Sequence, residues 1–494
     1  MDTFDVDIAI IGSGFSGLGM AIRLRQEGIE DFTVLERGDD VGGTWHFNTY
    51  PGCACDVPSH LYSFSFAPNP GWSDTYSRQP EIRDYLQRVA DEYGVRPYVR
   101  LNCNVTGVEW EAGGWTVATS HGPLRARVVV AGMGPLAEPK TPALEGLDTF
   151  EGETFHSARW NHDYDLKGKR VAVVGTGASA IQFVPEIQKD VEQLYVLQRT
   201  PPWIMPHPSR PIRRFEARLY ERFPWLQKLV RGAAYSAREL LVLGFVKHPR
   251  LMKLPERIAR RHMRHQISDP ALLEKVSPDY TIGCKRILPS NKWYRALSKP
   301  NVELLTGGVE KVTAHSIVTG EGTEREVDAI IFGTGFMVTD MPVGKMVRGV
   351  DGKTLDEAWR GSMKAHLGTT VPGFPNLFVL LGPNTGLGHS SMVYMIESQV
   401  AYVMDALRYM ARHGADTVQV RAEVAARSNA DLDERMASTV WNTGCASWYV
   451  DDTGRNATLW PDWTWRFRQR TASFDPADFE LTQRARGAAE PVPA

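Results

Sequence analysis

The chain has 494 residues and a formal net charge of −2, so its overall charge provides no general attraction to nucleic acid. No apolar run approaches the roughly 18 residues needed to cross a bilayer, which leaves no transmembrane segment. The length is enough for roughly three domains with buried cores. The first residues, Met1 to Asp5, lack the basic and apolar regions of a signal peptide, so we expect a cytoplasmic protein.

The first predicted unit is a strand, a glycine-rich turn and a helix. The apolar strand Val6–Ile11 runs into Gly12-Ser13-Gly14-Phe15-Ser16-Gly17, where the helix is expected to begin. A pyrophosphate can lie on such a helix N-terminus, because backbone without Cβ atoms allows close approach. Glu36 ends the next strand, 24 residues after the first glycine, and suits a free ribose 2′-hydroxyl. The pattern predicts FAD or NAD at this turn.

A second unit of the same kind follows, with the opposite charge at its end. The strand Val171–Val174 runs into Gly175-Thr176-Gly177-Ala178-Ser179-Ala180, and Arg199 stands 24 residues after the first glycine. An arginine at this place suits a 2′-phosphate, which favours NADP. Hydride can pass from NADPH to a flavin, whereas two nicotinamide cofactors would have nothing to exchange. We therefore interpret the chain as an FAD flavoprotein that NADPH reduces.

These repeated units predict an α/β fold with two doubly wound, Rossmann-like dinucleotide-binding domains. Residues 1–140 and 375–494 are assigned to the FAD domain, residues 141–208 and 281–374 to the NADP domain, and residues 209–280 to a helical insertion. The insertion is rich in arginine at helical spacing, which usually forms a solvated face, so membrane contact is not expected. A long helix is predicted from about His389 to His413, with Ser390 or Ser391 as its cap and Gly414 as its end. Its N-terminus could face an anionic reduced flavin or be an ordinary capped end. Residues 484–494 are expected to form a disordered tail.

The cysteines and the C-terminal tryptophans are expected to have structural roles in the packed core more than catalytic or binding roles. Five cysteines are too few and too unevenly spaced for a disulfide framework or a zinc site, and no metal is expected. The Cys53-Ala54-Cys55 pair would make a strained bridge with one residue between, so buried or half-buried thiols are expected. Five tryptophans could wall a hydrophobic pocket but more often form domain core: Trp441, Trp448, Trp460, Trp463 and Trp465.

Two longer motifs resemble those of the type I Baeyer–Villiger monooxygenases, in the class B flavoprotein monooxygenase family. Residues 42–56, from Gly42-Gly43-Thr44-Trp45 to Asp56, match the long motif of that family. Residues 150–161 match its fingerprint between the two nucleotide domains, with Asn161 where Pro or Asp is usual. Trp160 within this fingerprint differs from the Tyr or Phe of the related N- and S-oxidising enzymes. The resemblance covers nearly the whole chain.

The resemblance implies an enzyme that uses FAD, NADPH and O2 to insert oxygen beside a ketone carbonyl, giving an ester or lactone through a C4a-peroxyflavin. It implies FAD contacts at Gly12, Ser13, Gly14, Phe15, Gly17, Glu36, Thr44, Trp45, Tyr62, Val105 and Met392. It implies NADP contacts at Thr176, Gly177, Ala178, Ser179, Ala180, Ile181, Gln182, Arg199, Thr200 and Lys285. His156 and Trp160 would serve the hinge between the domains.

The resemblance also places Arg286 over the flavin and Asp56 beside it as the catalytic pair. A guanidinium does not lose its proton in a protein, so it would keep the peroxide anionic and stabilise the oxyanion formed on a ketone. Asp56 would orient the arginine and offset the cost of its burial. Two rivals remain open: a heteroatom-oxidising flavin monooxygenase acting on sulfur or nitrogen, and a flavin-bearing redox sensor without a substrate.

Overall fold

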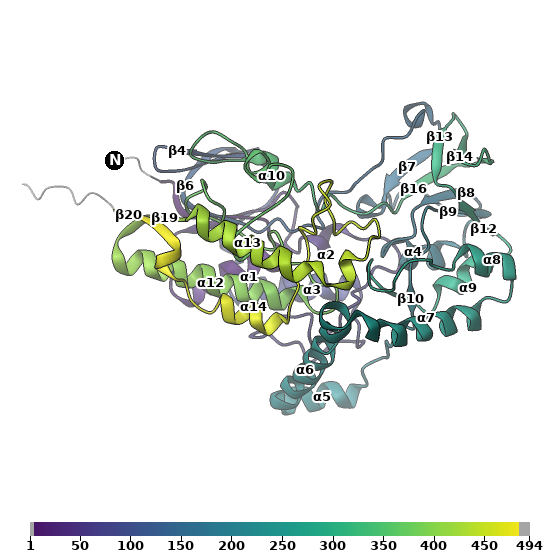
Figure 1. Ribbon diagram of the computed structural model, residues 1–494, viewed down its shortest axis with the longest axis horizontal. Coiled ribbons are helices and arrows are strands. Elements are labelled where there is room, and N and C mark those ends of the chain that lie inside the picture. Colours follow the sequence, from purple (N-terminus) through teal and green to yellow (C-terminus); the bar gives the residue numbers. More distant parts are fainter. Residues whose placement is uncertain (1–3, 484–494) are drawn as a thin grey trace, which may run out of the picture.

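The computed structural model describes residues 4–483, and its larger sheet contains both parallel and antiparallel strands. The strand order is β17-β4-β5-β6-β1-β2-β3, with β18 also paired to β6. Figure 1 labels β4 and β6 of this sheet. The strands are β1 (Val6–Ile11), β2 (Phe32–Leu35), β3 (Val99–Arg100), β4 (Val105–Glu111), β5 (Gly114–Thr119), β6 (Gly122–Ala131), β17 (Val347–Arg348) and β18 (Leu377–Val379). Ile8 and Ile10 of β1 are at most 1% exposed, as expected for a strand covered on both faces.

Helices cover this sheet. Helix α1 (Phe15–Gln26) starts directly after the glycine turn and packs against β1 and the long helix α12 (Met392–His413). The predicted long helix is confirmed, although it begins at Met392, where the hydroxyl of Ser391 accepts a hydrogen bond from the Val393 N–H. Gly414 ends it in the left-handed conformation. The other elements around this sheet are α2 (Thr44–Phe47), α3 (Gln79–Glu92), α13 (Ala422–Ala437), α14 (Thr464–Arg470), β19 (Ala415–Val420) and β20 (Phe479–Gln483).

A second, entirely parallel sheet has the order β12-β9-β8-β16-β7. Its strands are β7 (Glu153–His156), β8 (Arg170–Val174), β9 (Gln193–Gln198), β12 (Val302–Thr306) and β16 (Ala329–Phe332). Helix α4 (Ala180–Ile187) follows its glycine turn and packs against α9 (Trp293–Leu297). A small antiparallel sheet is formed by β13 (Val309–Val312), β14 (Ser316–Thr319) and β15 (Glu324–Glu326). The predicted α/β fold with two nucleotide-binding units is confirmed.

The chain returns to the first sheet before residue 375, where the sequence placed the boundary. Strand β17 pairs with β4, and Met341 and Val343 pack in the same cluster as Val108 and Trp115. The helices α10 (Pro342–Met346) and α11 (Leu355–Trp359) belong to this return. These elements are short and carry no glycine fingerprint, so the first clear sequence signal was the later strand β18.

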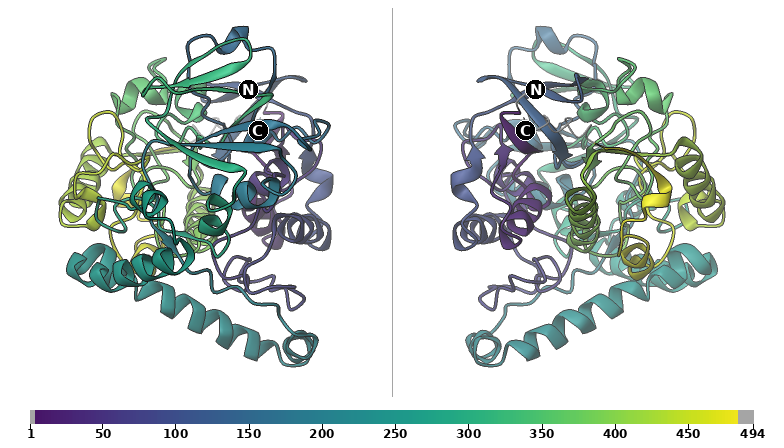
Figure 2. Two further views of the ribbon diagram at one scale, coloured as in Figure 1. Left: turned by 90° about the vertical axis from the view of Figure 1, so that its right-hand side faces the viewer. Right: turned by 90° about the vertical axis from the view of Figure 1, so that its left-hand side faces the viewer.

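The insertion between β10 (Ile204–Met205) and β11 (Leu288–Pro289) is helical. It consists of α5 (Arg214–Arg222), α6 (Pro224–Glu239), a π-helical turn η4 (Leu243–Lys247), η5 (Pro249–Met252), α7 (Lys253–Gln266) and α8 (Pro270–Lys275). Both views of Figure 2 show its teal helices along the lower edge of the molecule. Across residues 4–483, the helices are all too short or too polar to cross a membrane. The predicted disordered tail, residues 484–494, lies outside the described residues.

Candidate active site

The first glycine turn leaves space beside the N-terminus of α1. Gly12 has a φ of +92°, and a Cβ on Gly17 would lie 1.8 Å from the Gly12 carbonyl oxygen, so the helix packs directly on the turn. A Cβ on Gly14 would meet only Gly43 Cα, at 3.5 Å. Gly14 is the N-cap and offers no side-chain hydrogen bond, which leaves the first N–H groups of α1 available to a phosphate.

Glu36 is fixed to this turn by hydrogen bonds. One carboxylate oxygen accepts from the backbone N–H of Ser13 at 2.8 Å and from its hydroxyl at 2.6 Å. The other accepts from the Gly38 N–H at 2.7 Å, and the whole residue is 3% exposed. The turn and the expected ribose-binding carboxylate therefore form one preorganised unit.

The aromatic residues predicted to contact FAD lie together, whereas Val105 and Met392 of the same predicted set pack in other clusters. Trp45 of α2 donates its indole N–H to the Tyr62 hydroxyl at 3.1 Å, and the rings of Phe15 and Tyr62 are 5.2 Å apart. Thr44 begins the same short helix. Val105 at the start of β4 and Met392 at the start of α12 belong to different packing clusters.

The second glycine turn has the same form. Gly175 has a φ of +109°, and its Cβ would lie 2.5 Å from the Gly333 carbonyl oxygen, whereas a Cβ on Gly177 would lie 3.9 Å from that atom. Helix α4 begins at Ala180, so Thr176, Ala178 and Ser179 belong to the turn and Ile181 and Gln182 to the helix. The Thr176 hydroxyl donates to the Thr200 carbonyl at 3.4 Å.

Arg199 and Lys285 form a pair of cations near this turn. Arg199 follows β9 and is exposed, and the Lys285 ammonium lies 4.9 Å from the centre of the Tyr280 ring. Burial, and then the charge of Arg199, lowers the pKa of Lys285 below the ordinary lysine value. A bound phosphate would offset the repulsion between these two positive charges.

Arg286 and Asp56 come together from sequence positions 230 residues apart. The guanidinium donates from Nε to Oδ2 at 3.0 Å and from Nη2 to Oδ1 at 2.7 Å and Oδ2 at 2.6 Å. Burial opposes ionisation of Asp56, but the charge and hydrogen bonds of Arg286 hold its pKa below the ordinary value. The charge of Asp56 likewise raises the pKa of Arg286. The predicted pair is therefore a fully ionised, two-pronged contact.

Two further residues support this pair and were missed by sequence reasoning. Arg238 of α6 donates from Nη2 to the Asp56 carbonyl at 3.1 Å and to the Tyr76 hydroxyl at 3.3 Å. Burial raises the pKa of Tyr449 to about 12, while the charge of Arg286 and a hydrogen bond between the two side chains oppose that rise. Neither residue lies in a motif whose spacing points to Arg286.

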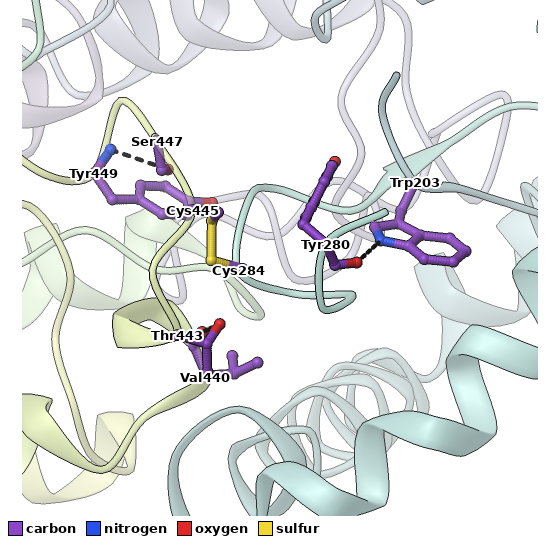
Figure 3. The surroundings of a disulfide bond; sticks show 8 residues. All are labelled: Trp203, Tyr280, Cys284, Val440, Thr443, Cys445, Ser447 and Tyr449. Carbon is purple, nitrogen blue, oxygen red and sulfur yellow. Dashed lines mark hydrogen bonds between the residues drawn. A yellow bond between two sulfur atoms is a disulfide. The ribbon is translucent and has the colours of Figure 1, made fainter. Parts of the chain in front are cut away.

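One disulfide, between Cys284 and Cys445, is present although the sequence predicted no disulfide framework. The two residues are 161 positions apart and their Cα atoms are 6.3 Å apart (Figure 3). Cys284 precedes Lys285 and Arg286, and Cys445 lies on the loop that carries Tyr449, so the bond joins the two loops. Spacing along the chain gave no sign of this pairing because only the fold brings the cysteines together. Cys53, Cys55 and Cys103 are free and buried, as expected, and burial raises the pKa of Cys53 to about 12.

Gln182 links the two nucleotide units. Its side-chain oxygen accepts from the Tyr50 hydroxyl at 3.0 Å and from the Ala54 N–H at 3.2 Å. Its amide nitrogen donates to the Ala54 carbonyl at 3.0 Å. A helix of the second unit thereby holds the loop that leads to Asp56.

Next to this link, His156 is buried and Trp160 is half-buried against the core. The Trp160 ring packs against Phe155 and Phe183, with centroids 5.1 and 5.3 Å away. Burial lowers the pKa of His156 to about 4, so its ring is neutral at ordinary pH. Trp441 and Trp460 are core residues at 1% and 2% exposure, whereas Trp448 and Trp465 are exposed.

Comparison with known proteins identifies the family. The chain is 53% identical to the Baeyer–Villiger monooxygenase of Streptomyces coelicolor, over 97% of this chain and 93% of that one. The chain belongs to the Baeyer–Villiger monooxygenase family. A relative of that name from Pseudomonas aeruginosa is also 53% identical, over 99% and 95% of the two chains. Residues 9–239 match the family model of the pyridine nucleotide-disulphide oxidoreductases.

Solved structures of this family have the same fold. A crystal structure of OTEMO with FAD and NADP has a TM-score of 0.88 at 27% identity, covering 97% of this chain and all of that one. The closed structure of cyclohexanone monooxygenase has a TM-score of 0.87 at 28% identity, covering 97% and 99%. The protein is accordingly an FAD- and NADPH-dependent monooxygenase that uses O2 and a small-molecule substrate. The two glycine turns fit these cofactors, since each leaves open the place of a Cβ at its second glycine.

Proposed function

We propose that the enzyme inserts one oxygen atom between the carbonyl carbon and a neighbouring carbon of a ketone. Ketone, O2, NADPH and a proton give an ester or lactone, NADP+ and water. The contact between Arg286 and Asp56 is the observation that carries this proposal. The names of the relatives, Baeyer–Villiger and cyclohexanone monooxygenase, also support a ketone as the substrate.

The residues of the two turns would hold the cofactors. Backbone N–H groups at the start of α1 would bind the FAD pyrophosphate, and Glu36 its ribose. Arg199 and Lys285 would bind the 2′-phosphate of NADPH, and the turn from Thr176 to Ser179 its pyrophosphate. FAD, when reduced, supplies the activation of O2. The need for NADPH fits the cytoplasmic location expected from the sequence.

Arg286 would act through a fixed positive charge. It cannot serve as a general acid, because a guanidinium paired with a carboxylate keeps its proton at every working pH. The fixed charge therefore favours the deprotonated, nucleophilic form of the oxygen that attacks the ketone over its protonated, electrophilic form. It also stabilises negative charge on the ketone oxygen. Asp56, Arg238 and Tyr449 would keep the guanidinium in one orientation.

An assay with a panel of ketones and sulfides tests the proposal. Oxygen and NADPH consumption would be followed while mass spectrometry identifies the products. We expect a mass gain of one oxygen on ketones, with hydrolysis of the product giving an acid and an alcohol. Oxidation of sulfides or amines with no ester from any ketone would instead support a heteroatom-oxidising enzyme. NADPH consumption without any oxygenated product would support a redox sensor.

A further inference from the structure

Helix α6 differs from an ordinary surface helix, because several of its polar side chains face the protein. Gln227 is 4% exposed and donates its amide N–H to the Asn69 carbonyl at 2.7 Å. Arg231 donates to the carbonyls of His60 at 2.8 Å and Ser63 at 3.0 Å. Glu239, at the end of the helix, accepts from the Thr464 hydroxyl at 2.7 Å. The inner face is thus tied to the body of the molecule by hydrogen bonds.

The opposite face of α6 is apolar and exposed. Trp225 is 59% exposed, Leu229 is 62% and Leu240, directly after the helix, is 60%. These residues are separated by helical spacings, and exposed small residues lie between them: Gly232, Ala233, Ser236 and Ala237. A surface helix normally buries its apolar stripe against the core. On α6 this stripe has no partner among the described residues.

The preceding helix α5 continues this surface. Phe215 is 59% exposed, Leu219 38% and Phe223 43%, at spacings of four residues. Helix α5 contacts α6, and Figure 1 shows both at the lower edge of the molecule, away from the two sheets. Single exposed apolar residues are common, but a contiguous set on adjoining helices marks an interaction surface. We call α5 and α6 with these side chains the insertion face.

Positive charge is concentrated in the insertion, including on the helices of the insertion face. From Arg210 to Gln266 there are 15 Lys and Arg residues against four Asp and Glu residues, while the remainder of the chain has 41 and 54. On α5 and α6 the basic side chains at positions 214, 218, 222 and 228 are exposed. Helix α7 adds a hollow of about 380 Å³ lined by Arg257, Arg260, Arg261, Arg264 and His265. The surface is therefore apolar with a basic border, which suits an anionic partner.

We propose that the insertion face docks the enzyme onto an anionic lipid surface, with α5 and α6 lying in the interface plane. Trp, Phe and Leu would enter the headgroup region, and the arginines and lysines would contact lipid phosphates. A second copy of the chain fits less well, because a symmetric contact through this face would bring together two surfaces that both carry excess positive charge. The proposed lipid contact departs from the expectation, drawn from the sequence, that the arginine-rich insertion forms only a solvated charged face. The sequence shows the apolar spacing but not which side of α6 faces the protein.

Vesicle sedimentation tests this proposal with the full-length holoenzyme. We expect the enzyme to sediment with vesicles of phosphatidylcholine and phosphatidylglycerol at low salt, and to stay in solution with phosphatidylcholine alone. High salt should weaken sedimentation because it screens the basic border. The variant Trp225→Ser/Leu229→Ser should lose at least about tenfold in vesicle affinity, as should Arg214→Glu/Arg218→Glu.

Val350→Ser is the matched control, because Val350 is 53% exposed and lies far from the insertion in the chain. It should sediment like the wild type. Circular dichroism and FAD content should be unchanged in all variants. The proposal is overturned if the wild type ignores anionic vesicles, or if the Trp225 and Leu229 variant sediments as well as the wild type. It is also overturned if light scattering shows a dimer that only this variant dissociates, since a second copy would then cover the face.

Discussion

Arg286 has a charge that Asp56 holds in place through both of its carboxylate oxygens. We predict that Arg286→Ala lowers ketone oxygenation by about 10²–10³-fold, because the fixed charge that favours an anionic oxygen is lost. FAD binding and hydride acceptance should persist, so the NADPH consumed should appear as hydrogen peroxide. Product chromatography with a peroxide assay measures both quantities.

Arg348→Ala is the matched control for this prediction. Arg348 lies on β17, at the edge of the first sheet, and its guanidinium is 3.6 Å from the carboxylate of Glu109 in an exposed contact. Its removal should leave ester yield unchanged. Wild-type coupling of NADPH to ester in Arg286→Ala would exclude Arg286 from catalysis.

If Lys285 binds the 2′-phosphate as proposed, NADPH binding should depend on pH. Its pKa is lowered by burial and by Arg199, so its positive charge is lost at a lower pH than that of an ordinary lysine. The charged form is the one that binds phosphate, so the KM for NADPH should rise as pH increases through this lowered pKa. The KM for NADH, which has no 2′-phosphate, should rise much less.

Lys285→Arg isolates the cause of that pH dependence. A guanidinium stays charged, so the rise in the KM for NADPH should disappear in this variant. Arg199→Ala should raise the KM for NADPH at every pH by roughly 30- to 150-fold, corresponding to about 2–3 kcal/mol for a charged hydrogen bond. A pH profile of Lys285→Arg identical to that of the wild type would assign the titration to another group.

At the level of elements, the sequence was most informative where local chemistry decides the structure. Apolar strands, glycines with positive φ and the residues that follow β2 and β9 predicted both nucleotide units, because each pattern lies within about 30 residues. The end of α12 at Gly414 was likewise predicted from a local signal, a glycine directly after the helix. The proposed catalytic pair came from motifs of a known family, not from spacing, since Asp56 and Arg286 are distant in the chain.

Features that only the fold creates could not be predicted. The early return of β17 to the first sheet, the contact of Tyr449 with Arg286 and the pairing of Cys284 with Cys445 all join distant segments. The orientation of α6, with its apolar stripe toward solvent, also depends on contacts between distant segments. Its apolar stripe is visible in the sequence, but the hydrogen-bond partners that turn its polar stripe inward are not.

The disulfide joins the loop before Arg286 to the C-terminal loop. We predict that Cys445→Ser lowers the midpoint of thermal unfolding by a few degrees under oxidising conditions, because a cross-link of this kind contributes about 2–4 kcal/mol. Turnover should also fall, since the loops of Arg286 and Tyr449 are no longer tied. Added reductant should bring the wild type to the level of the variant. The double variant Cys284→Ser/Cys445→Ser should behave like the single one, and a clearly additive loss would mean that the cysteines act separately.

At the scale of the whole molecule, the proposed catalytic site lies where the two nucleotide units and the insertion meet. Asp56 comes from the first unit, Arg286 follows the insertion, and Arg238 of the insertion bonds to the backbone of Asp56. Gln182 on α4 completes this junction by holding Tyr50 and Ala54. In the proposed arrangement the hydride donor and the flavin are bound by different units, which share one hydrophobic cluster and are also linked by the hydrogen bonds of Gln182.

We predict that Gln182→Ala slows reduction of the flavin by NADPH about tenfold or more, because small losses of alignment between reactants carry large kinetic costs. FAD content should stay at the wild-type level, since the first glycine turn and Glu36 do not contact Gln182. Stopped-flow absorbance would measure the reduction rate, and a peroxide assay would measure uncoupling. Gln188→Ala is the control, because Gln188 ends the same helix but bonds to Asn301 within the second unit, at 2.7 Å. Equal reduction rates in both variants would mean that the junction tolerates loss of this link and that other contacts set the distance between the two cofactors.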